Sequence, residues 1–255
     1  MSLVLTALPN IPMIQSGDDL VKIIITGLAE ANIQLQNEDI LVLAQKVVSK
    51  SEGRWVNLLN IIPSTRAIEL AQDVDKDPRL VELILRESNQ ILRTRTGTVI
   101  VEHRLGFVCA NAGIDHSNVA GEAKTDAEWV LLLPENPDSS AESIRKSLEK
   151  ISGTRLGVMI IDSHGRAWRQ GVVGVAIGLS GMPGLVDMRG KRDLFGYKLR
   201  ITTIGAADEL AAASSLLMGQ VDEATPIAHV RGFPYHLRQG SLKELLRPKE
   251  LDLFR

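Results

Sequence analysis

The sequence of 255 residues predicts a mixed α/β fold, with helices and strands alternating along the chain. Two short apolar runs, at 40–50 and 156–162, have the length and composition of buried strands. Between them lie amphipathic stretches with the helical period, such as Ile144, Leu148 and Ile151. No stretch approaches the roughly 20 apolar residues of a membrane helix. The length suits one large domain or two small ones.

The first half of the chain is predicted to begin with a strand at 2–8 and a helix at 17–31. Acidic residues near the start of that helix are favourable at the positive end of its dipole. The run at 40–50 becomes polar at its end, as a buried strand does when it delivers side chains to a site. A second helix is expected to open at Asp77-Pro78, and a hairpin is expected within 91–112.

The second half is predicted to place a helix between two buried strands. Ser139 or Ser140 would cap this helix, and Gly153 would end it. The following strand, 156–162, terminates in the carboxylate of Asp162. A glycine-rich region at 165–196 is the one candidate for a hinge or domain seam. The remaining elements expected are strands at 129–134, 199–206 and 226–231 and a helix at 207–218.

Charge and cysteine content narrow the class of protein. With 29 Lys+Arg against 31 Asp+Glu, the net charge of −2 gives no global attraction for nucleic acid or an anionic membrane. An aromatic content of 4% argues against a base-stacking surface. The single Cys109 cannot form an internal disulfide, and the N-terminus has no secretion-signal pattern. We therefore expect a cytoplasmic protein with neither nucleic-acid nor membrane partners.

Several common catalytic motifs are absent from the sequence. It contains no GxxxxGK[ST], GxGxxG, CxxC, HExxH or GxSxG. These absences exclude simple readings as a Walker-type NTPase, a Rossmann dehydrogenase, a zincin or an α/β-hydrolase.

The segment AQKVVSKSEGR, residues 44–54, is a first candidate for a site. Lys46 and Lys50 lie four residues apart near the predicted strand end, with polar Gln45 and Ser49 beside them. Lysines supply mobile point charges that could hold phosphates. The alternative is a solvated charged rim.

The segment CANAGIDHSNV, residues 109–119, is a second candidate. Its small residues allow the backbone to approach a ligand closely. Asp115 and Asn118 could then begin a site for a hard metal or a nucleotide base. Alternatively, they only stabilise a turn.

The segment IIDSHGRAWRQG, residues 160–171, is a third candidate. Asp162 follows a buried strand, where open α/β sheets place ligand-binding groups, and Ser163 adds a hydroxyl. Asp115 and Asp162 together could bind Mg²⁺ or Mn²⁺, which take one or two carboxylates besides phosphate oxygens and water. A lone histidine after a strand is more often a hydrogen-bonded loop residue than a base, so His164 is assigned no catalytic role.

Residues 218–226 are a weaker candidate. They place Gln220, Asp222 and Glu223 between a helix end and a strand. The alternative is an ordinary acidic connection, and spacing alone does not choose between the two.

Taken in order, these segments resemble the coenzyme F420-0:L-glutamate ligase family, whose members add γ-linked glutamate to a deazaflavin coenzyme. The resemblance covers nearly the whole chain. Its most specific part is CANAGIDHSN followed by a strand and Asp-Ser-His-Gly-Arg. The matching blocks are LPNIP, AQKVVSKSEG, GFVCANAGIDHSN, LLLPENPDSSA, IIDSHGRAWRQG, DMRGKRDLFG, ADELAAASSLLMG and PIAHVRG.

The resemblance implies an unusual mixed-sheet fold that forms an intertwined homodimer. Residues 1–255 would form a single γ-glutamyl ligase catalytic unit, in which 165–196 could separate two subdomains. The family uses GTP as co-substrate with two Mg²⁺ or Mn²⁺ ions, often with a K⁺ dependence. The chain ends shortly after the last family block, so no second domain is expected.

The resemblance also implies roles for individual residues. Asp115, Asp162 and Lys50 would be catalytic. Asp115 and Asp162 would bind one metal ion, and Ser163 and Gln220 would help to bind the other. The residues expected to contact GTP are Leu8, Pro9, Asn10, Ile11, Gln45, Lys46, Lys50, Asn118, Gly219, Gln220, Val221, Asp222 and Glu223. The last five belong to a segment, 218–225, that is expected to contact GTP as a whole.

One departure from the family pattern is visible. The family often reads SDTFGR where this chain reads IDSHGR. Ser163 keeps a hydroxyl, so it could still contact a metal ion. His164 replaces an apolar aromatic, a change that could alter substrate packing or be neutral.

The implied reaction begins with phosphoryl transfer from GTP to the terminal carboxylate of the precursor F420-0. The resulting acyl phosphate would be attacked by the α-amine of glutamate, and further γ-linked glutamates could follow. We hypothesise that Arg166, Arg169 or Arg189 binds the anionic acceptor. The alternatives are a deazaflavin- or flavin-binding oxidoreductase, with a flat cofactor in the region 165–196, and a non-catalytic nucleotide-binding protein.

Overall fold

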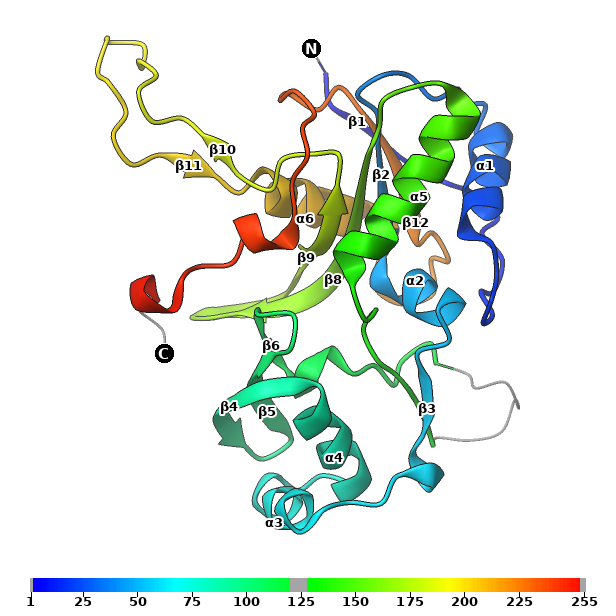
Figure 1. Cartoon of the computed structure of the whole chain (residues 1–255), viewed down its shortest axis with the longest axis vertical. Coiled ribbons are helices and arrows are strands. Elements are labelled where there is room, and N and C mark those ends of the chain that lie inside the picture. The colour runs from blue at the N-terminus through cyan, green and yellow to red at the C-terminus, as the bar shows by residue number, and fades with distance from the viewer. Residues whose placement is uncertain (1, 120–127, 253–255) are drawn as a thin grey trace.

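A five-stranded sheet forms the centre of the computed structural model, which describes residues 2–119 and 128–252 (Figure 1). Its strands β2 and β8 run parallel, and all its other neighbouring pairs are antiparallel. This sheet, with helices on both faces, confirms the predicted mixed α/β class. The strand order is β1 (Val4–Ala7), β12 (Ile227–Arg231), β2 (Ile40–Ala44), β8 (Gly157–Arg166) and β9 (Arg169–Ser180).

Helices cover both faces of this sheet. On one face, α1 (Leu20–Glu30) and α5 (Pro137–Ser152) pack on Leu41 and Leu43 of β2. On the other face, α6 (Ala206–Met218) packs on the alternate residues, Ile40 and Val42. Because both sets of alternate side chains are buried, β2 is a continuous apolar run.

A second lobe lies beside one end of the sheet, with a hydrophobic core of its own (Figure 1). Its core joins the helices to the hairpin through residues such as Val81, Ile84 and Val101. The lobe consists of α3 (Thr65–Val74), α4 (Pro78–Arg86), the antiparallel sheet β4 (Ser88–Arg95), β5 (Thr98–His103) and β6 (Val108–Ala110), and the pair β3 (Trp55–Asn57) and β7 (Trp129–Leu131).

Between the short strands β10 (Val186–Asp187) and β11 (Thr203–Ile204), the chain forms an arm that projects from the body of the molecule (Figure 1). Near its tip, Leu194 and Phe195 are 98% and 94% exposed. The described residues also contain short 3₁₀ turns at Leu58–Asn60, Asn111–Gly113, Leu242–Glu244 and Lys249–Leu251.

Several predicted elements are confirmed with small changes in their bounds. The predicted helix 17–31 is α1, and Asp19 caps it by accepting from the backbone N–H groups of Val21 and Lys22. Asp77 caps α4 in the same manner. The predicted hairpin is formed by β4 and β5, with β6 as a third strand. No helix in the described part of the chain is both long and apolar enough to cross a membrane.

The prediction of a strand over 40–50 is wrong beyond Ala44. Residues Gln45–Ser51 form the helix α2, so the lysines are carried by a helix that follows the strand. The polar residues support this: buried Ser49 donates to the side chain of Gln45 at 2.8 Å, one helical turn earlier. The four-residue spacing of Lys46 and Lys50 reflects the same period.

Three other boundaries differ from those predicted. Strand β8 does not end at Asp162 but continues to Arg166, because the chain turns there and pairs back along β9. Helix α5 is capped by Asn136, which accepts from the N–H of Ser139, with Pro137 in its first turn. The predicted strand 199–206 is reduced to the two residues of β11.

The glycine-rich region 165–196 holds the β8–β9 turn, β9 and the first half of the arm. The chain enters the second lobe after α2 and leaves it after β7. A division of the whole chain into two subdomains with a seam at 165–196 stays a prediction.

A buried ion-pair cluster joins β2 to β12 across the sheet. Asp39, which is 1% exposed, accepts from Arg231 at 2.7 and 2.9 Å and lies 2.8 Å from Nε2 of His229. Burial alone would raise the pKa of the Asp39 carboxyl. The hydrogen bonds from Arg231, together with the nearby His229, outweigh that effect and hold the pKa at about 2. The folded state therefore favours the ionised carboxylate.

We expect Asp39→Asn to destabilise the protein by about 2 to 3 kcal/mol near neutral pH. Because the folded pKa lies below the unfolded value of about 3.9, this contribution is present above pH 4 and is lost as the pH falls through about 2. The stability gap between wild type and variant should shrink by about half between pH 7 and pH 3. Urea denaturation at a series of pH values measures it, and a gap independent of pH would contradict the assignment.

Candidate functional site

The parallel pairing of β2 and β8 brings two candidate segments to one edge of the central sheet. Ala44 is paired with Ile161, so Gln45 and Asp162 leave this register side by side. A cavity of about 600 Å³ opens at this edge. Its lining includes Gln45, Lys46, Lys50, Asp115, Asn118, Asp162, Ser163 and residues 219–223. The structure thus brings together residues from all four candidate segments.

Helix α2 supplies the basic side of the cavity. Nζ of Lys46 donates to Oγ of Ser117 at 3.0 Å and lies 3.6 Å from Oδ2 of Asp115. Nζ of Lys50 donates to the backbone carbonyl of Asn118 at 2.8 Å, and the residue is buried. Burial lowers the pKa of Lys50, and the charge of Lys46 adds to this lowering. Both amines therefore point toward the segment that carries Asp115.

The backbone of Asp115 is fixed by the second lobe. Its N–H and carbonyl exchange hydrogen bonds with Leu131 of β7 at 3.0 and 2.9 Å. Before it, the turn Asn111–Gly113 has three consecutive residues with φ near +50° to +64°. At Gly113 a side chain would collide with Leu133, so the small residue is required here by packing within the protein.

The carboxyl group of Asp115 is in a buried environment, and the carboxylate of Asp162 lies nearby. Burial raises the pKa of the Asp115 carboxyl to about 6; Lys46 opposes this rise and the nearby charge of Asp162 adds to it. Its Oδ2 accepts from the amide of Gln45 at 2.6 Å. Two carboxylates that repel each other in one cavity are an arrangement that a cation would stabilise.

Asp162 lies within strand β8, where it pairs with Val175 of β9. Its Oδ2 lies 3.0 Å from Nε2 of His164, the histidine to which no catalytic role is assigned. Among the described residues, Oδ1 of Asp162 makes no hydrogen bond, and the same holds for Oδ1 of Asp115.

The opposite wall of the cavity is built from α6 and the loop after it. Ser163 donates to Oε1 of Gln220 at 2.8 Å, and the amide nitrogen of Gln220 donates to Ser215 at 2.8 Å. Across the cavity, Nδ2 of Asn118 donates to the carbonyl of Val221 at 3.0 Å. Ser163 with Gln220 and Asn118 with Val221 are thus two pairs of residues far apart in the sequence that the fold brings into contact.

Other predicted residues have different surroundings. Ile11 lines the cavity, but Leu8 is buried in the core beneath α1 and Asn10 donates to Glu30. Pro9 is not part of the lining. Glu223 lines the cavity and also accepts from the N–H of Val221, closing its own loop. Sequence reasoning missed Ser117 and Ser215, because neither stands out within its segment.

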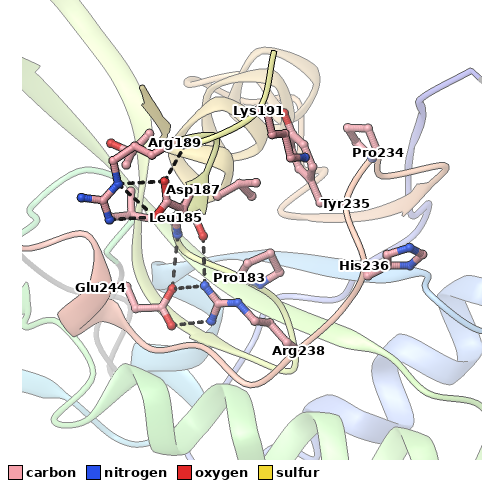
Figure 2. A pocket seen from close by; sticks show the side chains of 12 residues that line it. Pro183, Leu185, Asp187, Arg189, Lys191, Pro234, Tyr235, His236, Arg238 and Glu244 are labelled. Atoms are coloured by element: carbon pink, nitrogen blue, oxygen red, sulfur yellow. Dashed lines mark hydrogen bonds and ion pairs between the residues drawn. The ribbon is translucent and has the colours of Figure 1, made fainter. Parts of the chain in front are cut away.

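The arginines hypothesised for the acceptor do not gather at this cavity. Arg189 lines a separate cavity of about 710 Å³ beyond the end of β9, at the opposite end of the central sheet (Figure 2). There it donates to both oxygens of Asp187, and Arg238 donates to both oxygens of Glu244. Arg166 donates to the carbonyl of Gln170 in the β8–β9 hairpin.

The donor atoms of the first cavity fit a small, hard cation. Among the described residues there is no group of three or more His, Cys, Asp and Glu side chains that could hold a metal ion. The available donors are instead the carboxylates of Asp115 and Asp162, the Ser163 hydroxyl and the Gln220 amide oxygen. Oxygen donors with few carboxylates suit Mg²⁺ or Mn²⁺, which complete their coordination with phosphate oxygens and water. The basic groups of α2 could hold those phosphates.

Comparison with known proteins gives consistent matches along the chain. Residues 9–232 match the sequence model of the F420-0:gamma-glutamyl ligase family. A coenzyme F420:L-glutamate ligase from Methanothermobacter thermautotrophicus is 46% identical over 257 residues, covering 100% of both chains. Proteins of the same name from Methanocaldococcus jannaschii and Archaeoglobus fulgidus are 42% and 39% identical. Each of these two alignments covers 96% of this chain and 94% of the relative.

The close packing of β9 on α6 supports the wall that carries Gln220. A Cβ atom at Gly174 would lie 2.5 Å from Cβ of Ser215 and 2.6 Å from the carbonyl oxygen of Ala211. We expect Gly174→Ala to destabilise the fold by about 1 to 3 kcal/mol, because α6 must move to admit the methyl group. Gly165→Ala is the control, since a Cβ there meets nothing within 4 Å. Urea denaturation of both variants tests this, and equal stabilities would refute it.

Proposed function

Since the chain belongs to the F420-0:gamma-glutamyl ligase family, we propose that it ligates L-glutamate to the deazaflavin coenzyme precursor F420-0, with GTP as co-substrate. Further γ-linked glutamates could be added in the same way. The observation that carries the proposal is the single cavity that gathers two carboxylates and two lysines from three separate segments. Its residues offer what a bound nucleoside triphosphate needs: positive charge for phosphates and oxygen donors for hard cations.

The chemistry requires activation of a carboxylate, which is a poor electrophile. In the proposed reaction, a GTP γ-phosphoryl group is transferred to the terminal carboxylate of F420-0, and GDP leaves. The α-amine of glutamate attacks the acyl phosphate and expels phosphate as the amide forms. Lys46 and Lys50 orient the phosphates and neutralise part of the charge that develops during transfer.

Asp115 and Asp162 would hold one divalent cation, and Ser163 and Gln220 would contribute to a second. Bound Mg²⁺ or Mn²⁺ supplies charge neutralisation for the transferring phosphoryl group. Gln45 keeps Oδ2 of Asp115 engaged, so this carboxylate is oriented before any ligand arrives. A K⁺ requirement and a cytoplasmic location stay predictions.

We expect the purified protein, supplied with F420-0, GTP, Mn²⁺ and L-glutamate, to form GDP and a product heavier by one or more glutamate residues, as read by mass spectrometry. Asp115→Asn and Asp162→Asn should each lower the rate at least about 100-fold, because each removes a carboxylate that would hold the divalent cation whose positive charge balances the phosphates. Asp73→Asn is the matched control, since Asp73 is an exposed carboxylate on α3. No mass increase with wild-type protein would contradict the proposed activity. Near-normal rates in both site variants would contradict the roles of the two carboxylates. A flavin-loaded yellow preparation would favour an oxidoreductase instead.

We also propose that the protein is a homodimer joined through its arms. Leu194, Phe195 and Ile201 are 98%, 94% and 88% exposed, although side chains of this size are normally covered. They lie on a segment that extends away from the body, where it can reach across to a second copy (Figure 1). An arm exchanged in both directions would satisfy a twofold, self-complementary interface.

We expect the double substitution Leu194→Ser and Phe195→Ser to convert the dimer into a monomer, because it removes apolar area from the contact. Ile62→Ser is the control, since Ile62 is equally large and exposed but lies in the second lobe. Light scattering coupled to gel filtration gives the masses. A wild-type monomer at micromolar concentration, or a dimer in all three proteins, would rule out this arrangement.

A further inference from the structure

The contact between His164 and Asp162 lies at the edge of the proposed cation site. Nε2 of His164 lies 3.0 Å from Oδ2 of Asp162, a hydrogen-bonding distance. The two side chains are only 10% and 13% exposed. Since an ionised carboxylate can only accept, the proton of this bond lies on Nε2.

The imidazole ring is held in place from its other side. The ring of Phe107 packs against it with centroids 5.2 Å apart, and Phe107 stacks in turn on His103 at 5.2 Å. His103 is buried, so the column of three rings is anchored in the second lobe. The backbone of His164 is fixed too, because it pairs with Val173 of β9. The donor is therefore set in position before any ligand binds.

Because of the contact with His164, the two oxygens of the Asp162 carboxylate have different surroundings. Oδ2 of Asp162 is engaged by His164, while Oδ1 has no hydrogen bond within the described part of the chain. Asp115 shows the same division, with Oδ2 engaged by Gln45. In each pair, a fixed donor on one oxygen sets the direction in which the other oxygen presents its lone pairs.

We propose that His164 is a positioning residue that orients the carboxylate of Asp162 for a divalent cation, an inference that rests on the proposed function. It acts as a hydrogen-bond donor through Nε2 and is not itself a ligand. Asp115, Asp162 and His164 do not form a three-residue metal cluster among the described residues. Partners that hydrogen-bond to ligating side chains typically account for about 10- to 100-fold in metal affinity.

The test is direct Mn²⁺ binding without substrates, measured by calorimetry and by the electron paramagnetic resonance signal of free Mn²⁺. His164→Phe keeps a ring against Phe107 and removes the donor, so the Mn²⁺ dissociation constant should rise about 10- to 100-fold. His164→Gln places an amide N–H near the former Nε2 and should restore most of the affinity. His164→Asn is too short to reach and should bind as weakly as His164→Phe. His236→Phe is the control, because His236 is exposed and lies at the other cavity.

Each outcome decides between the inference and its premise. If wild-type protein does not bind Mn²⁺, the proposed cation site itself is wrong. If wild type binds and His164→Phe binds equally well, the cation site stands and the positioning role is overturned. Equal losses in the Gln and Asn variants would also overturn it, since they would indicate a ligand or a packing role. Thermal denaturation in the presence of a chelator verifies that the variants are folded. If His164→Phe does not fold, the comparison of His164→Gln with His164→Asn still tests the positioning role.

Discussion

The parallel pairing of β2 with β8 is the constraint on which the candidate site depends. Every other pair in the central sheet is antiparallel, so this is the one place where two neighbouring strands end at the same edge. The chain leaves β2 directly into α2, and Asp162 lies one position beyond the register of Ala44. A reversed β8 would carry Asp162 to the opposite end of the sheet, away from both lysines. The pairing is protected by burial on both faces, where α5 and α6 cover alternate side chains.

The second lobe completes what the sheet begins. It contributes Asp115, held by backbone bonds to β7, and Phe107, which packs against His164. The lobe has its own core and packs on the body of the molecule partly through Phe107, but polar groups of the cavity also join the two parts, such as Gln45 with Asp115. Polar contacts of this kind are short and directional, so small shifts between the lobes would change the geometry of the site more than that of either core.

The sequence predicted the main elements well because their signals are local: acidic residues at the two helix starts, which the structure shows as the caps Asp19 and Asp77, and alternating residues in the hairpin. It misplaced the end of β2 because an apolar run entering a helix looks like a longer strand until tertiary packing decides. The candidate residues came from local patterns and from family resemblance, and their convergence could not be read from spacing. Ser163 and Gln220 are 57 positions apart, and their contact depends on how α6 packs against β9. The role proposed for His164 was missed although its partner Asp162 is only two positions earlier, because the supporting ring of Phe107 is brought to it by tertiary structure.

The division of oxygens in Asp115 and Asp162 has a consequence for ion selectivity. When the protein donates a hydrogen bond to one carboxylate oxygen, that oxygen is a weaker donor to a cation, so coordination through the other oxygen alone, in a monodentate manner, is favoured. Ca²⁺ commonly takes both oxygens of a carboxylate among its six to eight ligands, whereas Mg²⁺ takes single oxygens in a compact octahedron. A cavity with this pattern would disfavour Ca²⁺ because its hydrogen bonds limit each carboxylate to one coordinating oxygen, and not because the cavity is too small. Gln45 and His164 would then together favour Mg²⁺ over Ca²⁺ at this site.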